Sequence, residues 1–152
     1  MNIFVLDLDP RKASEYHNDR HVVKMILETA QLLCTTHHQT GNHRVPYRST
    51  HINHPCAIWA RESLDNYLWL RDLGLALANE YSYRYEKIHK TQIVIEDLKT
   101  PDLKKKGLTD FELAMPEEYV IKNDIVGSYR NYYRRGKSHL AFWKKRGKPF
   151  WW

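Results

Sequence analysis

The sequence has no apolar run that approaches the roughly 20 residues a membrane-spanning helix needs. Residues 1–7 lack the basic residues with which a secretory signal begins. The acidic Asp7 also comes too early to leave room for the apolar stretch of such a signal. Internal repeats, low-complexity tracts and linkers are also absent. These absences predict a cytoplasmic protein that does not enter the membrane. A length of 152 residues suits one core, so we expect a single domain over residues 1–152.

The spacings that hold metal ions are also missing. The two cysteines, Cys34 and Cys56, lie far apart and form no CxxC pair, so we expect reduced thiols packed on helices. The nine histidines include no HExxH motif, and the spacing of His51 and His54 alone is a weak zinc signal. The sequence therefore predicts no metal and no cofactor.

Helical patterns cover most of the chain. Residues 2–6 indicate a short extended start, after which Asp9 and Pro10 can cap a helix that runs to about His38, with a possible break near Asn18. The apolar face of this helix is expected to consist of residues at helical spacing, namely Val22, Val23, Ile26, Leu27, Ala30, Leu33 and Cys34.

A second long helix is expected from Pro55 to about Tyr85, with Gly74 as its only weak point. At 1.5 Å per residue it would form a central rod about 45 Å long. Between the two helices lies a polar loop at residues 41–54. A loop of this length inside a compact domain is often functional.

The last third of the chain begins with an irregular connection at residues 99–118, which have no sustained period. Asn123 or Asp124 can then cap a helix that runs to about Arg135, and Ser138 can cap a last short helix. These patterns predict an all-α fold. We expect a compact single-domain helical bundle around one long central helix, with a short extended N-terminal segment.

Acidic residues are absent from the last 26 residues, 127–152, which carry eight Lys or Arg side chains and eight aromatic rings. Residues 1–126 carry 16 basic and 18 acidic side chains, a net charge of −2 within a chain of formal charge +6. Basic side chains neutralise phosphates and flat rings stack on bases, so this basic-aromatic segment predicts contact with nucleic acid. The alternative is a solvated charged helix whose rings complete the core. The candidate phosphate contacts are Arg134, Arg135, Lys144, Lys145 and Arg146.

A polar stripe runs beside the apolar face of the first long helix. His17, His21, Lys24 and Glu28 fall within about 60° of one another around the helix axis, because each residue turns by about 100°. Lys24 and Glu28 could form an ordinary surface ion pair. However, the stripe is flanked by apolar residues, so we take His21, Lys24 and Glu28 as candidate catalytic residues and His17 as a candidate nucleic-acid contact.

Further polar residues near the starts of the two long helices could contact phosphates, or could only keep their segments hydrated. These candidates for nucleic-acid binding are Arg20, Arg44, Arg48, His51, Asn53 and His54.

The segment Asn18-Asp19-Arg20-His21, followed by Glu28, resembles the first helix of the bacteriophage pyrimidine-dimer DNA glycosylase family. In that family a polar-Asp-polar-His turn precedes the catalytic glutamate by the same interval. Residues 54–61 lead into a long helix and are similar to the family's central helix. Residues 143–146 resemble its closing segment. The chain also resembles a group of small phage proteins.

The resemblance implies an all-helical DNA-repair enzyme of the host-cell cytoplasm. Such an enzyme flips a damaged or modified base out of duplex DNA, attacks the sugar C1′ with its N-terminal amine and cleaves the strand through an imine. Glu28 would stabilise positive charge on the sugar and then shuttle protons. We further expect the protein to act as a monomer.

One departure from the family pattern concerns the nucleophile. The family uses a small residue that is exposed when the initiator methionine is removed, whereas Asn2 is too large for efficient removal. Either the Met1 amine or Lys24 would then have to attack the sugar, or the chemistry has been lost. Two alternatives therefore stay open: a non-catalytic nucleic-acid-binding protein on the same scaffold, and a transferase or hydrolase that acts on free nucleotides.

The glycosylase hypothesis makes a geometric prediction. The nucleophile and the carboxylate must reach the same sugar, so Glu28 should lie in a concave pocket with His21. The nitrogen of Met1 should lie within about 10 Å of Glu28, because a larger gap would separate the two groups from a single reacting carbon.

Overall fold

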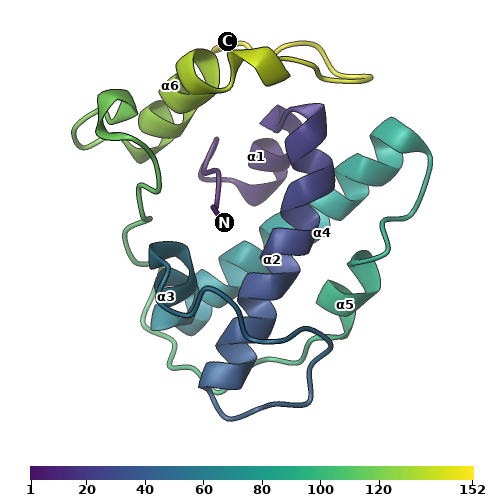
Figure 1. Ribbon diagram of the computed structural model, residues 1–152, viewed down its shortest axis with the longest axis vertical. Coiled ribbons are helices and arrows are strands. Elements are labelled where there is room, and N and C mark those ends of the chain that lie inside the picture. The colour runs from purple at the N-terminus through teal and green to yellow at the C-terminus, as the bar shows by residue number, and fades with distance from the viewer.

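The computed structural model describes all residues from 1 to 152, and it confirms an all-α fold with six α-helices, two 3-10 turns and no strand (Figure 1). The elements are α1 (Pro10–Tyr16), α2 (Asp19–Gln39), α3 (Pro55–Glu62), α4 (Leu64–Tyr85), α5 (Gln92–Asp97), η1 (Glu117–Tyr119), α6 (Ile125–Gly136) and η2 (Ser138–Leu140). None of these helices combines the length and the apolar character needed to cross a lipid bilayer.

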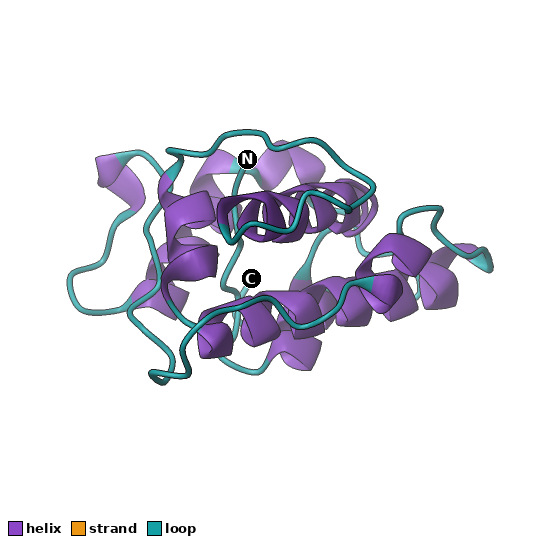
Figure 2. Ribbon diagram, turned by 90° about the horizontal axis from the view of Figure 1, so that it is seen from below, coloured by secondary structure: helices purple, strands orange, loops and turns teal.

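The centre of the fold is the crossing of α2 and α4, against which α1 and α3 also pack. One hydrophobic core joins these helices to the start of the chain, since Val5, Leu6, Ile26, Leu33 and Leu70 all have at most 1% of their surface exposed. Figure 2 shows the helices gathered around this core, with long loops passing over the outside.

The break expected near Asn18 is confirmed. Asp9 caps α1 by accepting a hydrogen bond from the backbone of Arg11, and Asn18 caps α2 by accepting one from the backbone of His21. These caps satisfy donors that have no partner within the helix, so each helix has its own start.

The predicted apolar face of the first long helix is partly wrong. Val22, Ile26, Ala30, Leu33 and Cys34 are fully buried. Val23 and Leu27, by contrast, are 39% and 40% exposed. They lie outside the face of α2 that the rest of the fold covers, because a packed helix buries only part of its circumference.

The prediction of one rod from residue 55 to residue 85 is also wrong, because the chain breaks at Ser63 between α3 and α4. Ser63 has extended backbone angles, and its hydroxyl accepts a hydrogen bond from the backbone of Asn66 at 3.0 Å. The same hydroxyl donates to the carbonyl of Gly107, also at 3.0 Å. The break is therefore fixed both by a local cap and by a partner in the distant loop.

The short helix α5 was not predicted from the sequence. It packs against α2 and α4, where Ile95 is completely buried. Gly74 of α4 lies directly beneath it, since a Cβ atom at this position would be 2.7 Å from Thr29 Cγ2 and 2.9 Å from Ile95 Cδ1. The weak point in the sequence pattern is therefore a place where three helices approach closely.

The basic-aromatic segment at residues 127–152, called the C-terminal segment from here on, crosses the end of the molecule at which α1 ends and α2 begins (Figure 1). The Trp143 indole donates to the carbonyl of Tyr16 at 2.9 Å, and the Asp19 amide donates to the carbonyl of Phe142 at 2.8 Å. Its last short helix is only the 3-10 turn η2. The rings of this segment divide between core and surface: Tyr129, Tyr133, Trp143 and Trp151 are buried, whereas Phe142 and Phe150 are exposed.

A buried ionic cluster fastens this segment to the helices beneath it. Arg84 has no exposed surface, and its guanidinium pairs with Glu80 at 2.8 Å and with Asp19 at 3.0 Å. Arg146 approaches Glu80 with two nitrogens, each at 2.9 Å. Burial alone would raise the pKa of Glu80, but the hydrogen bonds from Arg146 and Arg84 outweigh it and lower that pKa.

Candidate active site around Met1 and Glu28

The first six residues run as an extended segment between α2 and α6, with the N-terminus near the middle of the molecule (Figure 1). The Met1 nitrogen lies 3.9 Å from Glu28 Oε2. Both side chains are largely covered, with 3% of Met1 and 12% of Glu28 exposed. The distance between the Met1 nitrogen and the Glu28 carboxylate is therefore within the predicted limit of about 10 Å.

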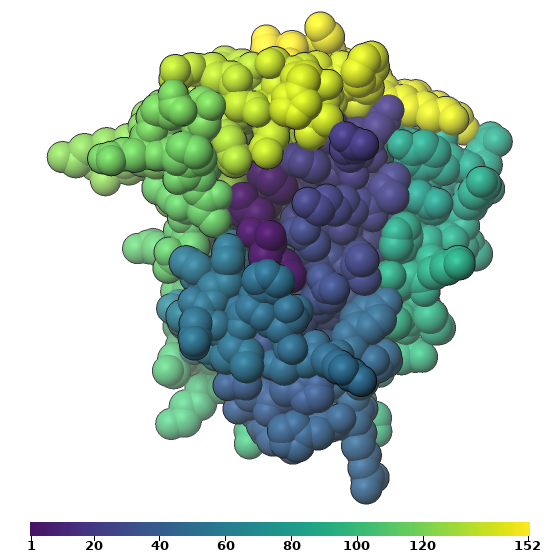
Figure 3. All heavy atoms as spheres, in the orientation of Figure 1, coloured from purple at the N-terminus to yellow at the C-terminus, as the bar shows by residue number.

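These two groups line a cavity of about 240 Å³. Figure 3 shows the N-terminal residues at the floor of a hollow, bordered by α2, α6 and the loop that leads into α3. The lining residues are Met1, Asn2, Phe4, His21, Lys24, Met25, Glu28, Ala114, Tyr132 and Lys137. The cavity is smaller than the roughly 300–1,000 Å³ of pockets for drug-sized molecules, so it suits a single small moiety.

Asn2 holds the Met1 amine in place. Its amide donates to the carbonyl of Ala114 at 2.8 Å, and its Oδ1 accepts from the backbone of Ile3 at 2.7 Å. The same oxygen lies 3.2 Å from the hydroxyl of Tyr129 on α6. Asn2, the residue that differs from the pattern of the glycosylase family, thus fixes the position of the first residues through these hydrogen bonds.

The cavity is positively charged except for Glu28. Lys24 Nζ lies 3.3 Å from Glu28 Oε1, so the carboxylate has one ammonium group on each oxygen. Lys137 also lines the cavity, with its Nζ 5.1 Å from the centre of the Tyr132 ring. Lys24 is 61% exposed and remains within reach of solvent or of a bound phosphate.

His21 lines the cavity as a neutral group. Its ring stacks on Phe4 with centroids 4.4 Å apart, and Nδ1 lies 2.6 Å from the hydroxyl of Tyr133. Burial lowers the pKa of His21 to about 3, helped by nearby His17 and Lys137. At neutral pH this ring can take part in hydrogen bonds, but it carries no charge.

His17 does not reach the cavity, so its predicted contact with nucleic acid is wrong. The residue is completely buried, and its Nδ1 lies 2.6 Å from the carbonyl of Ala13. Burial lowers the pKa of His17 to about 4. Its Nε2 has no hydrogen-bond partner. His17 is the C-cap of α1, so the polar stripe predicted for one helix starts before α2, and only His21, Lys24 and Glu28 share α2 and the cavity.

One end of the loop at residues 41–54 lies near the candidate active site, and the other lies near α5. His54 caps α3 by accepting a hydrogen bond from the Cys56 amide at 3.1 Å. The pKa of His54 is lowered first by burial and then by the Met1 amine, so this end of the loop borders the candidate site. His51 and Asn53 are exposed next to it.

The two arginines of the loop are exposed, but the structure does not bring them to the cavity. Arg44 lines a separate hollow beside Val94 and Leu98, near α5. Arg48 is exposed between these two regions of the loop.

The basic residues of the C-terminal segment also differ in availability. Arg134, Arg135, Lys144 and Lys145 are exposed, although Lys145 pairs with Glu86 at 3.0 Å. Arg146 binds the buried Glu80 with two nitrogens but keeps 35% of its side chain exposed, so its role as a phosphate contact stays a prediction.

Sequence reasoning missed Asn2, Phe4, Tyr132 and Lys137 as cavity residues. Lys137 carries a weak signal, because it belongs to the basic segment at 127–152. Tyr132 belongs to the same segment and carries the same weak signal, whereas Asn2 and Phe4 have none, since their roles depend on how the N-terminus and α6 meet. No group of three His, Cys, Asp or Glu side chains is arranged to hold a metal ion.

No family model, curated protein or solved structure matches the chain.

Proposed function

We propose that the protein is a DNA N-glycosylase with abasic-site lyase activity, which acts on a damaged or modified base flipped out of duplex DNA. The Met1 amine is the nucleophile and Glu28 is the catalytic carboxylate. The observation that carries the proposal is the separation of 3.9 Å between Met1 N and Glu28 Oε2 inside a cavity. A covered amine beside a covered carboxylate is the arrangement that imine chemistry on a sugar requires.

The proposed reaction begins when the unprotonated amine attacks C1′ of the deoxyribose. A C–N bond to Met1 forms and the N-glycosidic bond breaks, so its electron pair leaves with the base, which takes up a proton. As the sugar opens to an imine, the amine nitrogen gives up its two protons, which account for the one that the base takes up and the one that the ring oxygen gains. Glu28 is placed to move these protons and to balance the cationic intermediates.

The imine then permits strand cleavage by elimination. A proton leaves C2′, a double bond forms between C2′ and C3′, and the C3′–O bond breaks so that the 3′ phosphate departs. Lys24 and Lys137 line the cavity and can attract the flanking phosphates of the strand.

Borohydride trapping tests the proposal. Wild-type protein is incubated with duplex DNA that contains one abasic site, and sodium borohydride is added to reduce any imine to a stable amine. We expect a covalent protein–DNA adduct, and peptide mapping should place it on Met1. Intact mass spectrometry of the same preparation determines whether Met1 is its first residue. A variant extended by two residues before Met1 should give no adduct, because its amine no longer lies in the cavity.

Two variants separate the roles of the residues around the amine. Glu28→Gln should abolish strand cleavage while leaving affinity for DNA within a few-fold, because the amide keeps the shape but cannot accept a proton. Glu118→Gln is the matched control, since that carboxylate is exposed on η1. Lys24→Ala tests the competing nucleophile, whose ammonium lies 3.3 Å from the same carboxylate.

The outcomes distinguish the alternatives. An adduct that moves to Lys24, or disappears only in Lys24→Ala, would assign the nucleophile to that lysine. Tight duplex binding with no adduct and no cleavage would indicate a non-catalytic nucleic-acid-binding protein. Weak duplex binding that is insensitive to salt would favour an enzyme of free nucleotides. Full activity in Glu28→Gln would end the glycosylase proposal.

A further inference from the structure

Phe142 presents an aromatic ring to solvent from a firmly held backbone. The ring is 70% exposed. The carbonyl of Phe142 accepts a hydrogen bond of 2.8 Å from the Asp19 amide. The next two residues are fixed as well, since the Trp143 indole donates to Tyr16 O at 2.9 Å and the Lys144 amide donates to Asp19 Oδ1 at 2.8 Å. Because this backbone is already ordered, a planar ligand could stack on the ring with little loss of conformational entropy.

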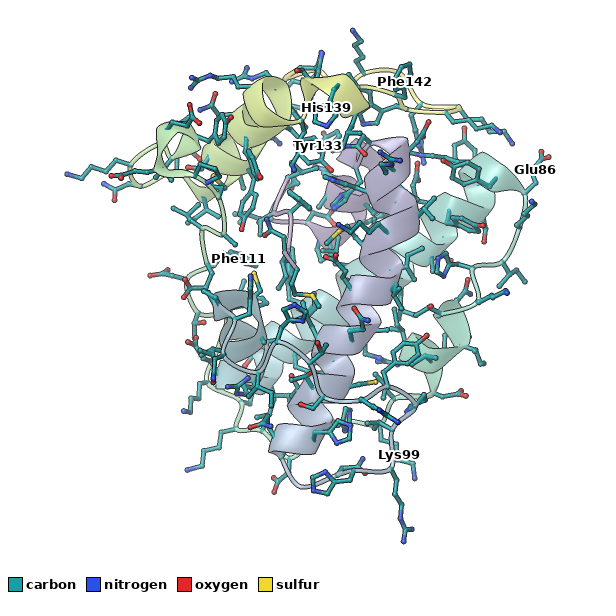
Figure 4. The ribbon with its side chains drawn as sticks, viewed as in Figure 1. Glu86, Lys99, Phe111, Tyr133, His139 and Phe142 are labelled. Carbon is teal, nitrogen blue, oxygen red and sulfur yellow. The ribbon has the colours of Figure 1, made fainter.

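The ring lines one of two hollows that share Asp19 and Arg20 at the start of α2. The first, of about 380 Å³, lies between Arg20, His139 and Phe142. The second, of about 580 Å³, lies between Arg20, Lys24 and Tyr85. Figure 4 labels His139 and Phe142 at the end of the molecule where the C-terminal segment crosses the start of α2.

These two hollows, which share Asp19 and Arg20, are together called the track, and the track adjoins the candidate active site at one residue. Lys24 lines both the second hollow and the cavity of Met1 and Glu28. A strand whose sugar occupies the cavity would therefore extend along Arg20 toward Phe142.

The charge of the track favours an anionic strand. Arg20 and Lys24 line it, and Lys144 Nζ lies 5.3 Å from the centre of the Tyr85 ring at its edge. The only acidic side chain among its lining residues, Asp19, is already paired with the buried Arg84 at 3.0 Å. Phosphate groups would thus meet Arg20, the exposed ammonium of Lys24, which pairs with Glu28 at 3.3 Å, and an acid that is already neutralised.

We propose that this track binds a DNA strand next to the reacting nucleotide, with an unpaired base stacked on Phe142 and its phosphates on Arg20 and Lys24. Aromatic stacking next to cationic side chains is the combination by which proteins hold single-stranded nucleic acid without reading its sequence. The inference rests on the proposed function in one respect, since it takes DNA as the partner.

The test measures binding of the full-length protein to a fluorescein-labelled single-stranded 12-nucleotide DNA of mixed sequence by anisotropy. Phe142→Ala should bind about tenfold more weakly, which is the usual loss for one stacked base. Phe150→Ala is the matched control, because this ring is 81% exposed in the same segment but lines none of the three hollows. It should bind within about twofold of wild type, as expected where no base stacks.

Arg20→Ala should reduce the dependence of log K on log salt by about 0.7, the contribution of one phosphate contact on a single strand. Equal losses in Phe142→Ala and Phe150→Ala, no loss in Phe142→Ala, or no binding by wild type would each overturn the inference. Thermal melting checks that the variants remain folded.

The two proposals can fail separately. Phe142-dependent binding without borohydride trapping would overturn the lyase proposal and leave the strand-binding track standing. Borohydride trapping by wild type, with no loss of single-strand binding in Phe142→Ala, would overturn the strand-binding track and leave the lyase proposal standing.

Discussion

At the residue scale, burial decides the protonation of His17. The residue is fully buried, and this burial lowers its pKa from 6.5 to about 4, although the hydrogen bond to Ala13 opposes the change. Nearby Arg84 lowers the pKa further, while Glu80 raises it. The unfolded chain therefore takes up a proton at a higher pH than the folded protein does. The resulting stability is fully present above about pH 6.5 and is lost as the pH falls toward 4.

This linkage gives a prediction for His17→Phe. Phenylalanine keeps the aromatic packing but cannot be protonated, so the free energy of unfolding should vary less between pH 4 and pH 6.5. A change of pKa from 6.5 to about 4 corresponds to about 3 kcal/mol over the full range. Urea unfolding at several pH values measures the slope. His139→Phe serves as the control, because His139 is exposed and its replacement should leave the slope unchanged. An identical slope in His17→Phe and wild type would contradict the prediction.

At the element scale, the close approach of α2, α4 and α5 at Gly74 leaves no room for a methyl group. The added Cβ would lie 2.7 Å from Cγ2 of Thr29 and 2.9 Å from Cδ1 of Ile95. Helix propensity favours alanine over glycine by about 1 kcal/mol, whereas overpacking a core typically costs about 1–3 kcal/mol. The packing cost is expected to win, because Thr29 is β-branched and cannot turn away easily.

We therefore expect Gly74→Ala to lower the free energy of unfolding by about 1–2 kcal/mol. Urea denaturation at pH 7 measures this change. The double variant Gly74→Ala with Thr29→Ser removes the methyl group that clashes, so it should recover most of the stability relative to Thr29→Ser alone. A higher free energy of unfolding for Gly74→Ala would contradict the prediction. It would mean that α2, α4 and α5 can move apart to accept the methyl group without losing stability.

At the scale of the whole molecule, the net charge of +6 is not all available to a partner. Arg84 and Arg146 are engaged in the cluster around Glu80, and Arg130 pairs with Asp7 at 3.3 Å. Arg134, Arg135, Lys144 and Lys145 are exposed at the end of the molecule that carries the candidate strand-binding track. These four side chains are the ones we expect to contact phosphates of duplex DNA.

If about four side chains neutralise phosphates, the slope of log K against log salt should be near −4 on duplex DNA. Replacing Arg134, Arg135, Lys144 and Lys145 together by alanine should make this slope markedly shallower. The matched control removes four exposed lysines elsewhere, Lys99, Lys104, Lys105 and Lys106, and should leave the slope unchanged. Fluorescence anisotropy between about 50 and 200 mM salt covers the range in which such contacts are most visible. Equal slopes in the two quadruple variants would mean that the C-terminal segment faces away from the DNA.

Several features of the fold could be predicted from the sequence because their causes are local. Asp9, Asn18 and Asp124 each cap a helix through an amide two or three residues away, so the pattern that predicts the cap also contains its partner. Lys24 and Glu28 share one helix face by spacing alone, and they form at 3.3 Å the ion pair that this spacing allows.

Other features were decided only by the tertiary structure, because their partners lie far away in the chain. The break at Ser63 adds a hydrogen bond to distant Gly107 to its local cap, and the exposure of Val23 and Leu27 depends on which face of α2 the rest of the fold covers. Arg146 belongs to a core cluster through Glu80, 66 residues away, although its sequence neighbours suggest a free basic tail. The candidate site depends both on local spacing in the sequence and on long-range contacts. The spacing on α2 and the family resemblance pointed to Glu28, but Asn2 holds the amine beside it through Ala114 and Tyr129, 112 and 127 residues away. Such contacts form only when distant segments bury their polar groups against one another, so no local pattern predicts them.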